Sequence, residues 1–148
     1  MPALWAGVLL AVATLATPAP FATLARADAG RVVGHIFVRE AWLSLVLAVL
    51  LLAMERGRAR QAADSGQGSQ FSTEMLLVLG TVFCTVAGYF GTQPLMAAAR
   101  AGQGAFSFGQ LHGISFGLFG LKILLVVTLA WRATKPAGTA LRPTGPSS

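Results

Sequence analysis

Five ionisable side chains lie within otherwise apolar stretches of this sequence: His35, Arg39, Glu40, His112 and Lys122. Such groups are costly in lipid, so they are functional candidates wherever they occur in a membrane segment. If their two segments cross in the same direction, His35 and His112 reach a similar depth and could hold haem, copper or zinc between them. Alternatively, backbone groups or interfacial water satisfy each ring. We expect no cofactor, and keep haem or copper at His112 and His35 as the alternative.

Glu40 and Lys122 allow two arrangements. The long Lys122 side chain can snorkel, extending its ammonium group to the cytoplasmic interface, and this is the interpretation we favour. It can also reach across the bundle to Glu40 and form a buried pair, while Glu40 can instead pair with its neighbour Arg39. A proton relay needs more than one acid, and Glu40 is the only acid in the apolar runs.

Four apolar runs must position these residues. Of the 148 residues, 55% are hydrophobic and 11% are charged, against about 25% charged in soluble domains. Each run has about 20 to 26 residues, enough to cross a hydrocarbon core of about 30 Å as a helix. We predict an all-α, antiparallel four-helix membrane bundle over 1–131, with helices at 4–24, 32–54, 75–96 and 106–131. Polar connections are expected at 25–31, 55–72 and 97–105, and a disordered cytoplasmic tail at 132–148.

Basic residues near the helix ends predict the orientation. One side would hold Arg56, Arg58, Arg60, Arg132, Lys135 and Arg142, and the other Arg26, Arg31 and Arg100. The richer side faces the cytoplasm, which places both termini there. A cleaved signal peptide ending near Ala29 is the alternative. No Lys or Arg precedes the first run, however, and the run exceeds an ordinary signal core, so we expect it to be retained.

Small residues recur at four-residue spacing in the last two runs: Gly109, Gly113 and Gly117 in one, and Gly80, Cys84 and Gly88 in the other. Small faces let helix backbones approach closely. We predict that these two faces pack together as a hairpin, and the alternative is that one of them mediates self-association.

The remaining polar and special residues predict packing roles. Gln93 and Gln110 are candidates for interhelical hydrogen bonds, and Trp5 for packing or an interface anchor. Pro18, Pro20 and Pro94 lie near the ends of their helices and are expected to kink or end them, with a widened mouth between helices as the alternative.

Several function classes are excluded or disfavoured. The single Cys84 excludes an internal disulfide or a C-x-x-C motif. The net charge is +6, but no basic face with interleaved aromatics is present, so we expect no nucleic acid partner. The sequence contains no nucleophile–base–acid set and no phosphate-binding glycine loop, so an enzyme is not the favoured class. The expected partners are the lipid bilayer and a second copy or another membrane protein.

Three motifs carry a family resemblance: Ala29-Gly-Arg-Val-Val-Gly34, Gln93-Pro-Leu-Met96 and Phe108-Gly-Gln-Leu-His-Gly-Ile-Ser115. In this order they resemble the transmembrane protein 205-like family, and the resemblance extends to Trp131. It implies a domain of unknown function with about four helices, as in the bacterial members, and no agreed activity. His112 falls within the family pattern, whereas His35 does not, and Lys122 and the Arg39–Glu40 pair look particular to this chain.

The function we predict is a non-enzymatic structural or accessory component of the bacterial inner membrane. One alternative is a haem- or metal-binding redox protein that uses His112 and His35. The other is a small transporter or exporter subunit, assembled through the glycine faces.

Overall fold

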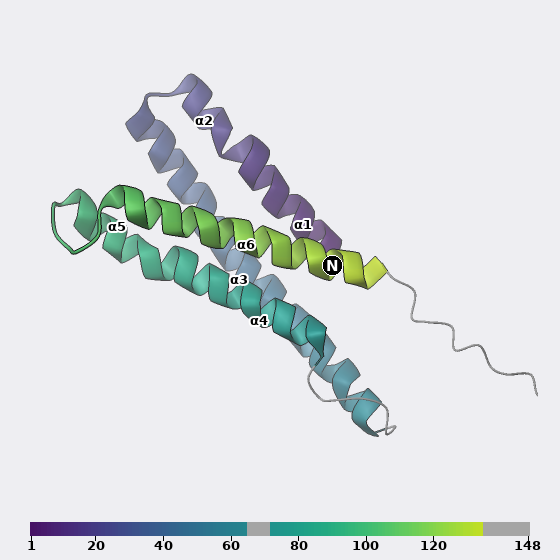
Figure 1. Ribbon diagram of the computed structural model, residues 1–148. Coiled ribbons are helices and arrows are strands. Elements are labelled where there is room, and N and C mark those ends of the chain that lie inside the picture. Colours follow the sequence, from purple (N-terminus) through teal and green to yellow (C-terminus); the bar gives the residue numbers. More distant parts are fainter. Residues whose placement is uncertain (65–71, 135–148) are drawn as a thin grey trace, which may run out of the picture.

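The computed structural model describes residues 1–64 and 72–134. Every element in this part of the chain is helical, and the elements form four rods (Figure 1). The all-α four-helix architecture predicted from hydropathy is confirmed. In chain order the elements are α1 (Pro2–Ala11), the π-helical η1 (Val12–Ala16), α2 (Pro18–Thr23), α3 (Arg26–Asp64), α4 (Thr73–Thr85), the π-helical η2 (Val86–Gly91), α5 (Thr92–Arg100) and α6 (Phe108–Thr134).

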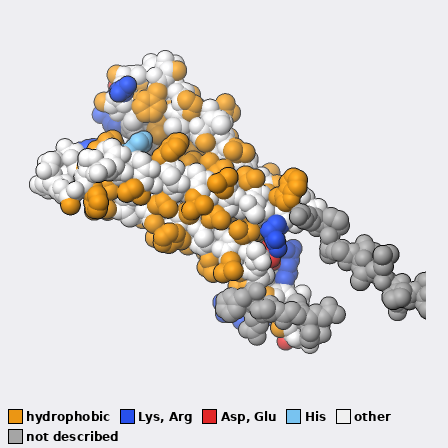
Figure 2. Space-filling model, viewed as in Figure 1, with side chains coloured by type: hydrophobic (Ala, Val, Ile, Leu, Met, Phe, Trp, Pro, Cys, Tyr) orange, Lys and Arg blue, Asp and Glu red, His pale blue; other side chains and the backbone are white. Residues whose placement is uncertain are grey.

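The outer surface of the bundle is apolar. Four helices are long and apolar enough to cross a membrane, namely Pro2–Thr23, Arg26–Gln61, Thr73–Arg100 and Phe108–Thr134. Large apolar side chains point outwards along them, among them Leu4 and Phe116, each 75% exposed. In the view of Figure 2, hydrophobic side chains cover the flank and basic ones gather towards its ends. Since water would disfavour such a flank, the chain is a multi-pass membrane protein.

The helix α3 is longer than the apolar run that predicted it. It begins at Arg26 and ends at Asp64, so the turn expected at 25–31 is reduced to Leu24 and Ala25. Ion pairs three residues apart support the added turns, since Asp28 pairs with Arg31 at one end and Glu55 with Arg58 at the other. Hydropathy misses such turns because they are polar.

The other boundaries differ less. The helix α6 continues to Thr134, past the predicted end at 131. Of the tail predicted at 132–148, only the first three residues are described, and they are helical. The rest of that tail, and the part of the predicted loop at 65–71, lie outside the described residues.

A π-helical segment precedes a proline in two of the rods. Each π segment lies just before a proline, η1 before Pro18 and η2 before Pro94. Proline lacks an N–H, and its ring clashes with the carbonyl group four residues earlier, so the preceding turn expands. The Thr17 N–H accordingly donates to the Val12 carbonyl, five residues back, at 2.9 Å. The first rod ends at Thr23, one residue from the predicted end at 24, whereas the third runs on to Arg100, past the predicted end at 96.

The four rods pack as a ring. The helix α6 lies against α1 and α4, and α3 lies against α4, so α3 and α6 occupy opposite corners. At one end, which we call the packed end, side chains of all four rods form a core that contains Trp5, Leu9, Leu51, Val78, Val126 and Leu129.

The opposite end is splayed. Within the described residues, α2 packs only against η1 and α3, and α5 only against η2 and α6. Figure 1 shows these two pairs diverging at the turns that join α2 to α3 and α5 to α6. We call this the splayed end: α2 with the first turns of α3, and α5 with the first turns of α6.

The glycine faces do not meet as predicted. A Cβ at Gly80 would lie 3.1 Å from Leu125 Cδ1, and one at Gly88 would lie 3.0 Å from Leu118 Cβ. By contrast, a Cβ would meet nothing within 4 Å at any of the three α6 glycines, Gly109, Gly113 and Gly117. The α4–η2 face therefore receives leucines of α6, which fill the available volume better than glycine against glycine. Cys84, between the two α4–η2 glycines in sequence, is buried.

Candidate functional site

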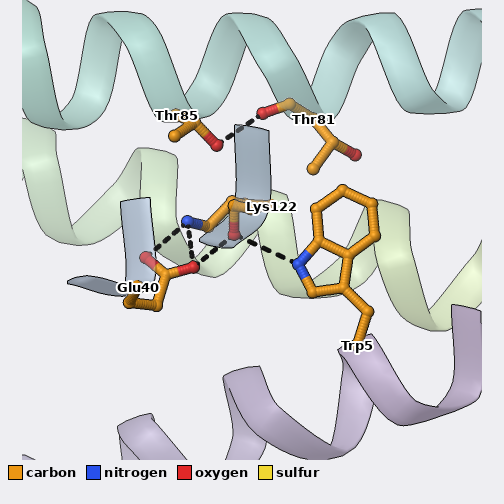
Figure 3. A network of polar contacts seen from close by, with 6 residues as sticks. Trp5, Glu40, Thr81, Thr85 and Lys122 are labelled. Carbon is orange, nitrogen blue, oxygen red and sulfur yellow. Dashed lines mark hydrogen bonds and ion pairs between the residues drawn. The ribbon is translucent and has the colours of Figure 1, made fainter. Parts of the chain in front are cut away.

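A polar network lies inside the bundle, with contributions from three rods (Figure 3). The Lys122 Nζ of α6 donates to both carboxylate oxygens of Glu40 on α3, each at 2.8 Å. The Ser44 hydroxyl, one turn further along α3, donates to Glu40 Oε1. The Trp5 Nε1 of α1 donates to Ser44 Oγ at 3.1 Å. A single chain of hydrogen bonds thus links α1, α3 and α6.

The charged pair lies at matching depth on its two helices. Glu40 is 14 residues beyond Arg26, where α3 begins, and Lys122 is 14 residues beyond Phe108, where α6 begins. At about 1.5 Å per residue, each lies about 21 Å from the splayed end of its helix. With a hydrocarbon core of about 30 Å, this places the pair deep in the bilayer. Equal depth is what allows the two side chains to meet.

Lys122 does not snorkel, and the interpretation favoured from the sequence is wrong. Its residue is 3% exposed and that of Glu40 is 5% exposed. An ammonium group this deep is far from either interface, and the carboxylate across the bundle offsets the loss of hydration that burial causes. Arg39, which we considered as a local partner of Glu40, is exposed on the outer flank of α3.

Long side chains bridge the diagonal between α3 and α6. The backbone of α3 carries small buried residues beside Glu40, among them Ala41 and Ser44. On the α6 side, the Phe119 ring lies 4.9 Å from Lys122 Nζ, a cation–π distance. The same ring packs edge-on against Phe37 of α3, with centroids 5.1 Å apart. Aromatic rings thus cover the pair on the side of the splayed end.

A small cavity borders the ion pair. It has a volume of about 30 Å³ and is lined by Glu40 and Lys122 together with polar and aromatic residues: Phe37, Cys84, Thr85, Gly88, Tyr89, Ser115 and Phe119. A water molecule needs roughly 10–15 Å³ and two or more polar partners. The cavity is therefore large enough for one water and far too small for an organic substrate, whose sites measure about 300–1,000 Å³.

Backbone carbonyl groups accept hydrogen bonds from hydroxyls at or near the cavity, those of Thr85 on α4, Thr92 on α5 and Ser115 on α6. Thr85 donates to the Thr81 carbonyl at 2.9 Å. The Gly88 carbonyl accepts from two hydroxyls, that of Thr92 at 2.7 Å and that of Ser115 at 2.8 Å. The second bond ties the π-helical turn to α6. Across the described residues, every fully buried side-chain nitrogen or oxygen has a hydrogen-bond partner.

The two histidines have different surroundings. His35 is exposed on α3 and lines an open groove with Val32, Ile36 and Arg39. His112 is exposed on α6 and stacks on the Phe108 ring at 5.8 Å between centroids. Among the residues with described positions, no cluster of three or more His, Cys, Asp or Glu side chains could hold a metal ion.

The glutamines have local or surface positions. The Gln110 N–H donates to Ser107 Oγ at 3.2 Å, and the Ser107 N–H donates to Gln110 Oε1 at 2.9 Å. This reciprocal pair is a capping box that starts α6, so the interhelical role predicted for Gln110 is wrong. The Ser-x-x-Gln spacing in the sequence could have predicted this capping box. Gln93 is exposed on α5.

Sequence reasoning missed two members of the network. Trp5 was expected to pack or to anchor at the interface, yet it is 1% exposed and donates a hydrogen bond. The contact between Ser44 and Glu40 could have been predicted, since Ser44 lies four residues after Glu40 and hence on the same helix face. Nothing in the local sequence pairs either residue with the other, because 39 positions separate them.

The fold and this buried network define a multi-pass, four-helix membrane protein with a charged centre. A family model described as a domain of unknown function (DUF4149) matches residues 1–105, and the chain belongs to this family. The matched region includes Glu40, Ser44 and Trp5, whereas Lys122 lies beyond it. Searches of curated proteins and of solved structures gave no match.

Proposed function

We propose that this protein is a non-enzymatic structural or accessory component of the bacterial inner membrane, and a member of the transmembrane protein 205-like group. The observation that carries the proposal is the closed network of Trp5, Ser44, Glu40 and Lys122. Its groups are satisfied by one another, and the adjoining cavity has room for one water. Such a centre holds helices in register and does not pass a substrate.

The network suits a scaffold for a physical reason. A buried ion pair adds little net stability compared with well-packed apolar residues, but breaking one partner is strongly unfavourable. The pair between α3 and α6 therefore disfavours every arrangement in which the two charges separate. It selects one packing of the rods, and this packing presents a constant outer surface to lipid, to another membrane protein or to a second copy.

Reconstitution tests this role against the alternatives. Protein purified from its native membrane is expected to show no Soret band and no stoichiometric metal. In liposomes that carry a pH-sensitive dye and a potassium diffusion potential, proton flux should equal that of protein-free liposomes. A Soret band lost in His112→Ala, or bound copper, would support the redox alternative and overturn the proposal.

A small proton-conducting or transport role is the second candidate, and the cavity beside the pair favours it. Glu40, Lys122 and Ser115 all line this cavity, and intramembrane ionisable residues often mark ion or substrate pathways. Flux above background that is lost in Glu40→Gln, with Arg60→Gln unchanged as the control, would establish this role in place of the scaffold.

We also propose that the packed end and both termini face the cytoplasm. The single native thiol, Cys84, is buried, so Cys84→Ala gives a background without cysteine for labelling. In spheroplasts, Gln103→Cys at the splayed end should react with an impermeant maleimide, and Arg60→Cys should react only after lysis. The reverse pattern would invert the topology.

A further inference from the structure

A basic stripe follows the outer flank of α3. Arg31, His35 and Arg39 are four residues apart, share one helix face and are all exposed. Arg31 already has a partner, since it pairs with Asp28 on its own helix. Arg39 has no carboxylate oxygen within 4 Å among residues 1–64 and 72–134. Its neighbour Glu40 points into the bundle and is held by Lys122.

Arg39 is much deeper than a typical interfacial arginine. It lies 13 residues beyond the start of α3, about 20 Å along the helix and next to the buried ion pair. His35 lies nine residues in, at about 14 Å. Apolar residues such as Val46 and Val49 are exposed further along the same helix, so this flank faces lipid. A guanidinium group in lipid without an anion is strongly disfavoured, and long side chains at such depths draw polar headgroups or water towards themselves.

The stripe combines polar and apolar residues on one exposed face of α3. Val32, His35, Ile36 and Arg39 line one side of an open groove along the outer face of α3. The guanidinium group can donate two parallel hydrogen bonds to a phosphate, and the imidazole can donate another. Val32 and Ile36 offer contact to hydrocarbon. The combination matches a phosphate attached to an acyl-glycerol unit.

We propose that this groove binds the phosphate of an anionic phospholipid from the leaflet at the splayed end, with Arg39 and His35 as donors. Inorganic phosphate would have to leave water to reach this depth. A lipid phosphate, in contrast, stays attached to acyl chains that lie against the apolar flank. The bilayer can thin locally, which brings this phosphate closer to the depth of Arg39. The Asp28–Arg31 pair nearer the helix start leaves Arg39 as the cation available to the headgroup.

Thermal unfolding of the full-length protein in a neutral detergent tests the site. Added phosphatidylglycerol is expected to raise the melting temperature of the wild type, whereas phosphatidylcholine and inorganic phosphate are not. Arg39→Gln should weaken the apparent affinity for phosphatidylglycerol at least tenfold while leaving the melting temperature without lipid unchanged. Arg39→Lys should fall between the two, because it keeps the charge and loses the bidentate geometry.

Arg60→Gln is the matched control, since Arg60 is an exposed arginine of the same helix beyond the packed end. It should bind phosphatidylglycerol like the wild type. An equal loss of phosphatidylglycerol affinity in Arg60→Gln would mean that overall charge governs binding. Equal stabilisation by phosphatidylcholine would mean that the groove recognises only acyl chains. Stabilisation by inorganic phosphate would assign the groove to a free anion. Each of these results overturns the lipid site.

Discussion

The packed end and the splayed end of this bundle use the same four rods in different ways. At the packed end, bulky side chains from separate rods interlock, and Trp5, Leu9, Val78 and Val126 are at most 1% exposed. At the splayed end, the buried residues are Ala29 in one pair of helices and Thr92, Met96 and Leu111 in the other. Packing there stays within each helix pair, because α2 and α5 have no neighbour across the bundle in the described structure.

The difference in packing predicts which end contributes more to stability and which end opens first. Association of helices in lipid depends on van der Waals packing and hydrogen bonds, since lipid removes the hydrophobic driving force between them. The packed end has both, as the Trp5–Ser44 bond lies beside its core. At the splayed end, in the described structure, α2 and α5 contact only the helices of their own pair. We therefore expect local opening to begin at the splayed end.

The largest effect is expected where the packed end adjoins the ion pair. Lys122→Met leaves the Glu40 carboxylate buried without its cation and should lower the free energy of unfolding by about 3–5 kcal/mol. The double variant Glu40→Met/Lys122→Met removes both charges and should recover most of that loss. Thermal unfolding of the single and double variants in the same detergent measures both changes in stability. A double variant that unfolds as readily as the single one would contradict the pair's role.

Two leucines compare the ends directly. Leu9 at the packed end is 0% exposed, and Leu111 at the splayed end is 3% exposed. Leu9→Ala should destabilise by about 2–5 kcal/mol, because rigid neighbours from several rods cannot close the cavity. Leu111→Ala should have a smaller effect, since a helix pair without neighbours across the bundle can relax. Equal losses in denaturant or thermal titrations would show that the splayed end is as tightly packed as the other.

Two glycines compare a tight contact between helices with an open helix face. A methyl group at Gly88 would lie 3.0 Å from Leu118 Cβ, whereas one at Gly113 would meet nothing within 4 Å. Gly88→Ala should therefore cost about 1–3 kcal/mol through overpacking. Gly113→Ala should stabilise α6 by up to about 1 kcal/mol through helix propensity. If Gly113→Ala instead lowered stability and shifted the protein to a smaller species in light scattering, the α6 glycines would form an interface between copies.

The smallest effect is expected at a helix cap of the splayed end. Ser107→Ala removes the cap that satisfies the Gln110 N–H and should cost about 1 kcal/mol. Because local opening begins there, hydrogen exchange should rise in the first turn of α6 with little change in the melting temperature. Ser72 caps α4 at the packed end, and Ser72→Ala is the matched control, which should lower the melting temperature. The opposite pattern would reverse our assignment of the two ends.

Hydropathy predicted the number and type of the helices well, and their ends less well. The apolar runs lie largely within the observed helices, because transfer into lipid depends on each segment by itself. The errors at α3 arose where charged pairs such as Asp28–Arg31 extend a helix into water. The sequence did not predict the π-helical turns before Pro18 and Pro94, which accommodate the missing hydrogen bonds.

The candidate site was predicted only in part. Glu40 and Lys122 stood out as ionisable groups in apolar runs, but their pairing was the less favoured interpretation. Trp5 and Ser44 entered the network only through tertiary contacts. The glycine faces were predicted to meet, yet α6 presents Leu118 and Leu125 to α4 and η2 instead. Spacing identifies a helix face, but it does not say what that face meets.

The sequence by itself determined that lipid is the solvent of this chain and that four helices cross it, because the free energy of inserting each segment is a property of that segment alone. Only the tertiary structure decided that α3 and α6 face each other diagonally at equal depth, so that Lys122 meets Glu40 and Arg39 is left on the outer flank. These outcomes depend on distances between residues far apart in the chain, and such distances are set by how side chains fill the space between helices.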